Sequence, residues 1–167
     1  MIETNRLIIK PLTYNQLLKY IKNDNSLEKD LGLINSLKII SSELKEALEI
    51  NILPNVANKN LNYLYYTLWT IILKENKIMV GDLCFMGEPN ELGEIEIGYG
   101  IYDEFRKNGY MTEAVNCIVS WAQNQSIIKS IIAKTYKDNI DSYSVLLRNK
   151  FVKTNEDDEF FYWQIKL

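Results

Sequence analysis

The fold is decided by the stretch Gly98-Tyr-Gly-Ile-Tyr-Asp-Glu-Phe-Arg106-Lys-Asn-Gly109-Tyr-Met-Thr-Glu-Ala114. It predicts the end of a buried strand, a short turn with one glycine, and the start of a helix. The first N–H groups of a helix have no intrahelical partner and lie at the positive end of its dipole, so this junction can hold an anion such as a pyrophosphate. Gly109 lets the backbone approach such a ligand closely. The alternative is an ordinary connection in which Asn108 is the N-cap and Gly109 a spacer.

Composition and length indicate a globular chain with one domain, residues 1–167. Lys and Arg number 19 against 22 Asp and Glu, a net charge of −3, which argues against nucleic acid as the main partner. The N-terminal segment lacks a signal pattern, and no apolar run approaches the roughly 18–20 residues that span a bilayer. We therefore expect a cytoplasmic protein without a membrane partner. Cys84 and Cys117 lack CxxC spacing, so neither a disulfide nor a metal site is predicted.

The chain contains no histidine. This excludes Ser-His-Asp and Cys-His nucleophilic schemes as well as HExxH metal sites. Any proton transfer must therefore be carried out by Glu, Asp, Tyr, Lys, Ser or water.

Hydrophobic periodicity and turn residues predict a mixed α/β fold. Strands are expected at 6–11, 63–73, 78–85, 94–101, 130–136, 151–153 and 160–165, and helices at 14–21, 42–50, 110–123 and 139–149. Residues 31–33 are expected to form a loop. The second to fourth strands suggest an antiparallel meander, whereas a doubly wound fold would alternate strand and helix throughout. We therefore expect a mixed sheet with helices on both faces.

Two groups of polar residues follow neighbouring strands. Alternation along 94–99 puts Glu94 and Glu96 on one face of the strand and the isoleucines between them on the other. Carboxylates just before the anion cradle suit a general base, although a solvated strand face explains them equally well. Farther along, Asp138 or Asn139 is expected to cap a helix that has Ser142 in its first turn. Both groups can converge on one cleft.

Several motifs in order carry a family resemblance. They are the opening Glu3-Thr4-Asn5-Arg6-Leu7-Ile8, the strand Glu96-Ile97-Gly98-Tyr99, the helix entry Gly109-Tyr110-Met111-Thr112-Glu113-Ala114, the loop Arg106-x-x-Gly109-x-Met111, and Asn139-x-x-Ser142 followed by Val145-Leu146 and Phe151. With these motifs the chain resembles the GNAT superfamily of acetyl-CoA-dependent N-acetyltransferases over nearly its whole length. It is similar to the branch that contains the ribosomal-protein N-terminal acetyltransferases. The loop resembles the family's pyrophosphate loop, and the last motif its C-terminal CoA element.

Three residues depart from that family's pattern. Met111 stands where the loop usually ends in Gly or Ala, and Lys150 stands at a position that is usually Gly. Leu146 stands where many relatives place a tyrosine that acts as general acid. That role therefore passes to Ser142 or to another hydroxyl such as Tyr143.

The resemblance implies a GNAT-like acyl-CoA N-acyltransferase fold, with a mostly antiparallel sheet splayed between its fourth and fifth strands, 94–101 and 130–136. It implies an enzyme that moves an acetyl group from acetyl-CoA to a primary amine by direct attack in a ternary complex, without a metal. Glu96 is the implied base, with Glu94 as second choice, and Ser142 would donate to the departing thiolate. The residues implied to bind acetyl-CoA or the oxyanion are Ile97, Gly98, Tyr99, Arg106, Lys107, Asn108, Gly109, Tyr110, Met111, Thr112, Asn139 and Ser142.

The sequence leaves the acceptor open, either a protein or peptide N-terminus or a small amine. The run Asp157-Asp158-Glu159 would suit a cationic acceptor, although such a run is more often a solvated turn. Tyr63, Tyr65 and Trp69 are expected on one strand face, where they line a pocket or pack the core. One alternative from another class is a non-catalytic acyl-CoA-binding module of the same fold. Another is a different nucleotide-binding protein, against which the absence of GxGxxG argues. A monomer and a homodimer are both compatible with the sequence.

Overall fold

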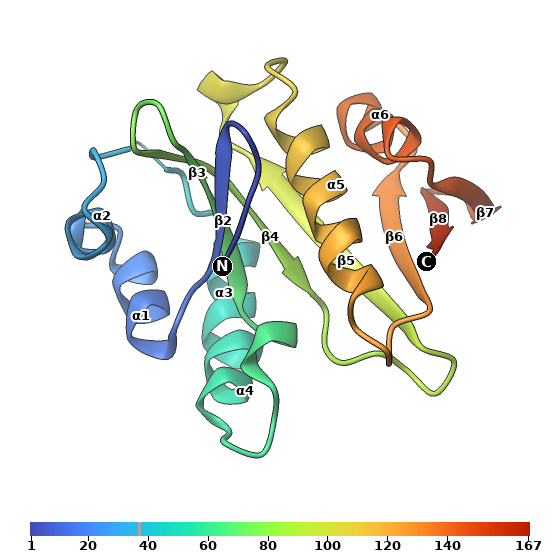
Figure 1. The fold of residues 1–167 in the computed structure, drawn as a ribbon, viewed down its shortest axis with the longest axis horizontal. Coiled ribbons are helices and arrows are strands. Elements are labelled where there is room, and N and C mark those ends of the chain that lie inside the picture. Colours follow the sequence, from blue (N-terminus) through green and yellow to red (C-terminus); the bar gives the residue numbers. More distant parts are fainter. Residues whose placement is uncertain (37) are drawn as a thin grey trace.

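The sheet consists of two antiparallel halves that meet at one parallel pair of strands. The computed structural model describes residues 1–36 and 38–167, and within them one eight-stranded sheet has the order β1-β2-β3-β4-β5-β6-β8-β7 (Figure 1). Only β5 and β6 pair parallel among the described strands. The strands are β1 Ile2–Glu3, β2 Leu7–Pro11, β3 Leu68–Leu73, β4 Ile78–Phe85, β5 Glu94–Ile101, β6 Ser130–Tyr136, β7 Val152–Glu156 and β8 Phe160–Lys166. The predicted mixed sheet, with β3 to β5 as its meander, is confirmed.

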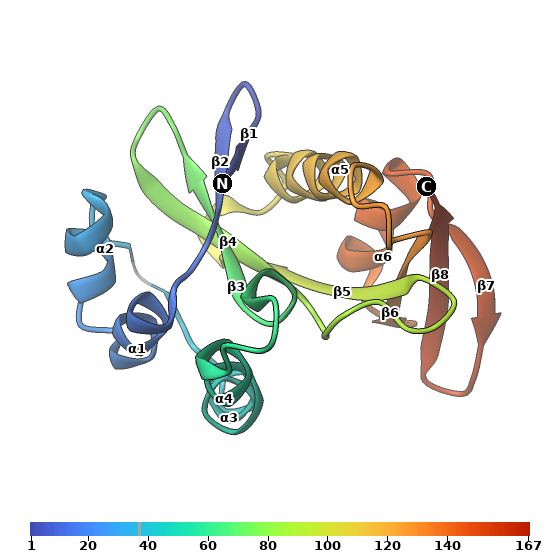
Figure 2. The same cartoon turned by 60° about the horizontal axis from the view of Figure 1, so that its bottom comes forward.

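Helices cover both faces of the sheet, as predicted (Figure 2). One face carries α5 Tyr110–Gln123 and α6 Ile140–Arg148, and the other carries α1 Tyr14–Lys22, α2 Ser26–Leu31, α3 Ser42–Ala47 and α4 Leu53–Ala57. Each face has its own buried core. Among the described residues, the core under α1 to α4 draws no side chain from β6, β7 or β8. The C-terminal half of the sheet is therefore bare on that face.

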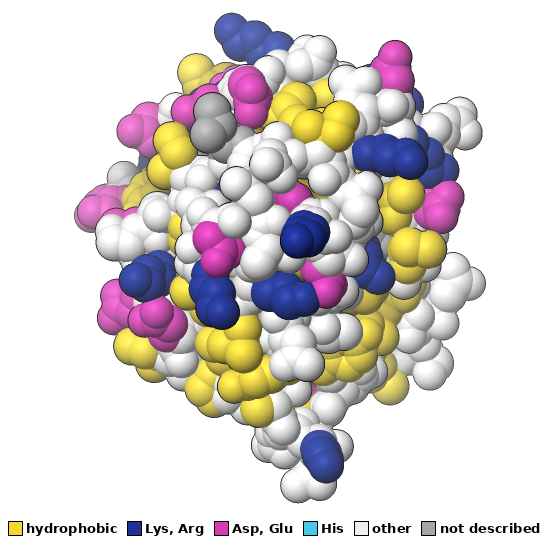
Figure 3. Space-filling model, turned by 90° about the vertical axis from the view of Figure 1, so that its left-hand side faces the viewer, with side chains coloured by type: hydrophobic (Ala, Val, Ile, Leu, Met, Phe, Trp, Pro, Cys, Tyr) yellow, Lys and Arg dark blue, Asp and Glu magenta, His cyan; other side chains and the backbone are white. Residues whose placement is uncertain are grey.

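The side of the molecule that bears α1 and α2 intersperses basic and acidic side chains (Figure 3). Lys19 of α1 forms an ion pair with Asp30 of α2, and Lys74 forms one with Glu3 at 2.8 Å. Among the described residues on this side, positive and negative side chains are therefore mixed.

Helix α5 forms as predicted because its apolar residues recur at helical spacing. Its buried residues are Met111, Ala114, Val115, Ile118, Val119 and Ala122. On the same helix, Trp121 contacts Trp69 and Phe85 at 5.3 and 5.5 Å between ring centroids. These contacts fix the C-terminal end of α5 against the sheet, and the buried Met111 and Ala114 fix its beginning.

The strand expected at 63–73 begins only at Leu68. Its first residues form a 3-10 turn instead, because the Asn62 side chain accepts a hydrogen bond from the backbone N–H of Leu64 at 3.2 Å. The expectation that Tyr63, Tyr65 and Trp69 share a strand face is therefore wrong. Tyr65 and Trp69 are buried in the core, whereas Tyr63 is exposed.

Three short N-terminal features also differ from the prediction. Strand β1 and helix α2 were not expected, and Gly32 ends α2 in the left-handed conformation, φ 66°. The helix expected at 42–50 continues through a π-helical turn, Leu48–Ile52, into α4. Such short elements depend on tertiary contacts more than on local propensity.

A buried carboxylate joins α1 to the sheet. The hydroxyls of Tyr20 and Tyr102 both donate to Asp82 Oδ2 at 2.8 Å. The other oxygen, Oδ1, has no hydrogen-bond partner within the described part of the chain, and neither has Oγ1 of Thr70, its cross-strand neighbour. Burial raises the pKa of the Asp82 carboxyl above its ordinary value, although the hydroxyls around it oppose that shift.

Because its pKa is raised, the Asp82 carboxylate is predicted to lower the free energy of unfolding by an amount that depends on pH. The folded protein holds the Asp82 proton more tightly than the unfolded chain, so the contribution of Asp82 to wild-type stability falls as pH rises from about 4 through its folded-state pKa. Asp82→Asn cannot ionise and keeps an acceptor for both tyrosines. We expect the free energy of unfolding of the variant, minus that of wild type, to grow by up to about 1.4 kcal/mol per pH unit in this window. Urea titrations at several pH values measure it, and a difference that stays flat with pH contradicts the prediction.

Candidate functional site

Strands β5 and β6 part after three residue pairs. The parallel register joins Glu94 to Ser130 and ends with Glu96 opposite Ile132, although β5 continues to Ile101 and β6 to Tyr136. The outer edge of β5 stays paired with β4 up to Ile101, and β6 stays paired with β8 up to Tyr136. The expected splay between these two strands is confirmed. It opens a cleft whose walls are both held by the sheet.

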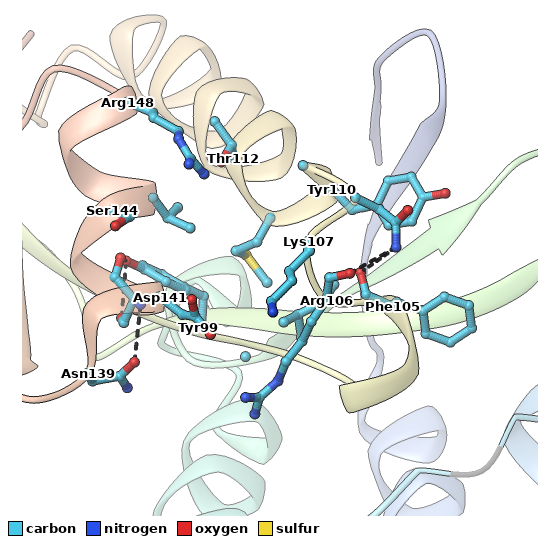
Figure 4. A pocket seen from close by; sticks show the side chains of 17 residues that line it. Tyr99, Phe105, Arg106, Lys107, Tyr110, Thr112, Asn139, Asp141, Ser144 and Arg148 are labelled. Atoms are coloured by element: carbon cyan, nitrogen blue, oxygen red, sulfur yellow. Dashed lines mark hydrogen bonds between the residues drawn. The ribbon is translucent and has the colours of Figure 1, made fainter.

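Two cavities lie at this split. The larger cavity, about 580 Å³, is walled by the end of β5, the following loop, the first turn of α5 and one face of α6 (Figure 4). The smaller cavity, about 350 Å³, lies between β5 and β6. Tyr99, Asn139 and Ser142 line both, so the two cavities adjoin at these residues. The other predicted site residues, except Glu94, divide between the two cavities, with Arg106, Lys107, Asn108, Gly109, Tyr110, Met111 and Thr112 in the larger and Glu96, Ile97 and Gly98 in the smaller.

The start of α5 lacks a side-chain cap. Gly109, not Asn108, is the N-cap, with φ 77°, and no side chain of the described residues accepts a hydrogen bond from the first turn. The first intrahelical bond at this end runs from Glu113 N to Gly109 O, 3.1 Å. The N–H groups of Tyr110 to Thr112 precede it and belong to residues that line the larger cavity. This is the arrangement in which a helix binds an anion.

The loop before α5 is held from both ends. The Asn108 amide donates to the carbonyls of Phe105 and Arg106 at 3.2 and 3.0 Å. Arg6 donates to the Asn108 carbonyl at 3.1 Å and to Glu113 at 2.7 Å, and its guanidinium lies 4.8 Å from the Tyr110 ring centroid. Arg6 therefore positions the loop, a role that the sequence analysis missed because no local spacing connects residues so far apart in the chain.

Positive side chains approach the larger cavity from two sides. Arg106 and Lys107 come from the loop, and Arg148 comes from α6 (Figure 4). Arg106 is paired with Asp103 at 2.8 Å. Arg148 was missed, although Asp141, Ser144 and Arg148 line the cavity at the helical spacing that predicted α6.

Asn139 caps α6 and also lines the cavities, as expected. Its Oδ1 accepts from Ser142 N at 3.1 Å, which confirms it as the cap of α6. Its Nδ2 makes no hydrogen bond to the described residues, so a donor remains at the junction of the two cavities. Beside it, the Tyr99 hydroxyl donates to the Ser142 carbonyl at 2.8 Å, and Ser142 Oγ donates to the Tyr99 hydroxyl at 3.4 Å. Burial raises the pKa of Tyr99 to about 12, so its phenol is protonated at neutral pH.

The two carboxylates of β5 have different surroundings. Glu94 lies where the strands are still paired, accepts from Gln164 at 2.8 Å and Asn90 at 3.1 Å, and lines neither cavity. Glu96 is half-buried, lines the smaller cavity and accepts no side-chain hydrogen bond within the described part of the chain. The geometry thus favours Glu96 over Glu94 for proton transfer.

The acidic run after β7 is a structural turn. Asp157 accepts from the backbone N–H groups of Glu159 and Phe160 at 3.0 and 2.8 Å and from the Tyr162 hydroxyl at 2.7 Å. These bonds lower the pKa of the Asp157 carboxyl, the Tyr162 bond most strongly. Its carboxylate oxygens are therefore engaged within the turn.

The residues that depart from the family pattern have structural explanations. Met111 is 5% exposed and packs in the core, and Leu146 is fully buried, so no hydroxyl stands there. Tyr143 stacks on Trp163 at 6.0 Å between centroids and lines neither cavity, which leaves Ser142 as the hydroxyl of this pair at the site. Lys150 adopts the left-handed conformation that favours glycine, φ 65°.

Neither a metal cluster nor a membrane span is found in the residues described. No group of three or more His, Cys, Asp or Glu side chains there could hold a metal ion. No described helix combines the length and apolar character needed to cross a bilayer.

The chain has relatives among known proteins. The family model described as acetyltransferase (GNAT) domain matches residues 6–152. The chain is similar to the uncharacterized N-acetyltransferase YjdG of Bacillus subtilis, with 29% identity over 98% of this chain and 96% of that protein. Its fold is similar to RimL, the ribosomal L7/L12 α-N-protein acetyltransferase, solved in complex with coenzyme A (TM-score 0.69, 16% identity, 98% and 96% covered). It is also similar to the ribosomal-protein-S5-alanine acetyltransferase of Vibrio fischeri (TM-score 0.68, 17% identity, 98% and 94% covered). The match over most of its length places this chain in the GNAT acetyltransferase family.

Proposed function

We propose that this protein transfers the acetyl group of acetyl-CoA to a primary amine, with Glu96 as the base. The observation that carries the proposal is the split between β5 and β6, which sets an uncapped helix start on one side of a cleft and a half-buried carboxylate on the other. A phosphate-bearing thioester and an amine could therefore meet between the two strands.

The larger cavity fits the phosphate end of acetyl-CoA. The backbone N–H groups of residues 107–111 would hold the pyrophosphate, with positive charge from Arg106 and Lys107. The pantetheine arm would pair with the free strand edges, and Asn139 Nδ2 would donate to one of its carbonyls. The volume of about 580 Å³ lies within the usual range for small-molecule sites, about 300–1,000 Å³.

Glu96 would prepare the acceptor by taking a proton from its ammonium, directly or through a water. This is needed because α-amines titrate near 8 and lysine-like amines near 10. The amine nitrogen would then attack the acetyl carbonyl, so that a C–N bond forms and the C–S bond breaks. A backbone N–H of Ile97 to Tyr99 would stabilise the oxyanion.

Ser142 would turn its hydroxyl proton from Tyr99 to the departing sulfur, while the hydrogen bond from the Tyr99 hydroxyl to the Ser142 carbonyl holds the residue in place. Because a thiol titrates near 8.5, the leaving group needs little help from an acid. One second candidate function is a module that binds acyl-CoA without transferring the acyl group. It is favoured by the buried Leu146, which stands where many relatives have a tyrosine that acts as general acid. The acceptor class, the cytoplasmic location and the monomeric or homodimeric state stay predictions.

Glu96→Gln tests the base. We expect kcat/KM for acetyl transfer to fall about 10²–10⁴-fold, the usual contribution of a general base, with acetyl-CoA affinity unchanged. The assay is release of CoA thiol from acetyl-CoA over a panel of amines and N-terminal peptides. Glu94→Gln is the matched control and should stay active, since its partners Gln164 and Asn90 lie outside both cavities. Equal losses of activity in both variants would contradict the assignment of Glu96 as the base. Wild type that binds acetyl-CoA and acetylates nothing would favour the binding module.

Gly109→Ala tests the phosphate cradle. An alanine at φ 77° is strained by about 1–2 kcal/mol, and we expect the backbone to relieve this strain by shifting the N–H groups of the first turn. We expect calorimetric affinity for acetyl-CoA to fall about tenfold. Gly32→Ala carries the same kind of strain at φ 66°, in open space and outside both cavities. It should lose stability but keep its affinity, so a similar affinity in both variants argues against the cradle.

A further inference from the structure

Lys134 of β6 and Glu96 of the neighbouring strand β5 face the same cavity, the smaller one. In parallel pairing, Ile132 and Glu96 point to one side of the sheet, and alternation puts Lys134 on that side two residues farther along. Both side chains line the smaller cavity. A carboxylate from β5 and an ammonium from β6 therefore flank the point where the strands part.

The Lys134 ammonium rests on aromatic rings. Its Nζ lies 3.6 Å from the Phe160 ring centroid and 5.6 Å from that of Tyr162. No ion pair in the described part of the chain involves it, whereas its neighbours Lys137 and Lys153 both pair with Glu156, at 3.9 and 2.7 Å. The ammonium therefore lies beside the cavity without an ion pair, although its charge is felt by the Asp157 carboxylate, which accepts from the Tyr162 hydroxyl.

The face around Lys134 is open. Helices α1 to α4 lie over the other half of the sheet and leave β6 and β8 bare on this side (Figure 2). Tyr136 is exposed and lies 4.4 Å from Phe160 between ring centroids, and both line the smaller cavity. An acceptor arriving from this side would meet an apolar surface, the Glu96 carboxylate and the Lys134 ammonium.

We propose, resting on the acetyl transfer proposed above, that the acceptor is a free α-amino acid with an apolar or aromatic side chain. Its ammonium would face Glu96, its carboxylate would bind Lys134, and its side chain would contact Tyr136 and Phe160. A polyamine brings a second cation toward Lys134 and is repelled. The neutral carbonyl of a peptide N-terminus leaves Lys134 without an anion. The zwitterion alone among these matches both charges.

The test compares L-phenylalanine with L-phenylalaninamide in wild type, Lys134→Met and Lys137→Met. The amide keeps the amine and the ring and lacks only the negative charge. Methionine keeps an unbranched chain on Phe160 and removes the ammonium. Lys137 is the matched control, since it lies close by on the chain, carries the same charge and lines neither cavity.

In wild type we expect the ratio of kcat/KM, acid over amide, to be about ten to a hundred times that of Lys134→Met, the usual effect of a hydrogen bond to a charged group. Comparing ratios between variants cancels the different intrinsic reactivity of the two amines. Lys137→Met should keep the wild-type ratio. An unchanged ratio in Lys134→Met, or equal loss for both amines, overturns the proposal and favours a peptide N-terminus or another neutral acceptor.

Calorimetry with the CoA-saturated protein separates this inference from the proposed function. If L-phenylalanine binds and its affinity falls at least tenfold in Lys134→Met, the anion site is supported. If wild type at the same time transfers no acetyl group, the transferase proposal is rejected. Neither binding nor acetylation of L-phenylalanine overturns the inference, and acetylation of other amines in the same assay would leave the transferase proposal intact.

Discussion

The early end of the β5–β6 pairing is the constraint on which the site depends. Beyond Glu96 and Ile132, the facing N–H and C=O groups of two central strands have no ladder partner in each other. Such groups need water or a ligand, because an unpaired backbone group is costly to bury. The strands cannot close on each other, since β4 holds the outer edge of one and β8 that of the other. The cleft is therefore a rigid part of the sheet, and an extended polar ligand is its natural complement.

The sequence predicted the elements around this cleft because their signals are long and local. The apolar periodicity from Met111 to Ala122 specifies α5, and the alternation around Ile95 and Ile97 specifies β5. The elements that were predicted wrongly are short. Tyr63–Tyr65 looked like strand because aromatic residues favour strands, yet one side chain, Asn62, supplies a turn. Helix α2 has only six residues between left-handed caps, too few for periodicity to reveal.

The site was predictable where one segment carries it and not where distant segments meet. The loop and first turn of α5 follow from a single motif, and the cap at Asn139 from residue type. Strand alternation could not distinguish Glu94 from Glu96, since it puts both on one face. The distinction comes from Gln164 of β8, which lies 70 residues later in the chain and engages Glu94. Arg6 and Lys134 likewise acquire their roles only through tertiary contacts.

Strand alternation also puts Glu96 and the basic residues of the larger cavity on opposite faces of the sheet. Ile95 and Ile97 turn toward the core under α5, so Glu96 must point to the opposite face, together with Lys134. The larger cavity, on the helix side, takes its positive groups from Arg106, Lys107 and Arg148. An acidic chain with net charge −3 can thus offer local positive potential to phosphates and a carboxylate to an ammonium within one cleft. The two ligands would then enter from opposite faces of the sheet and meet at Tyr99, Asn139 and Ser142, where the two cavities adjoin.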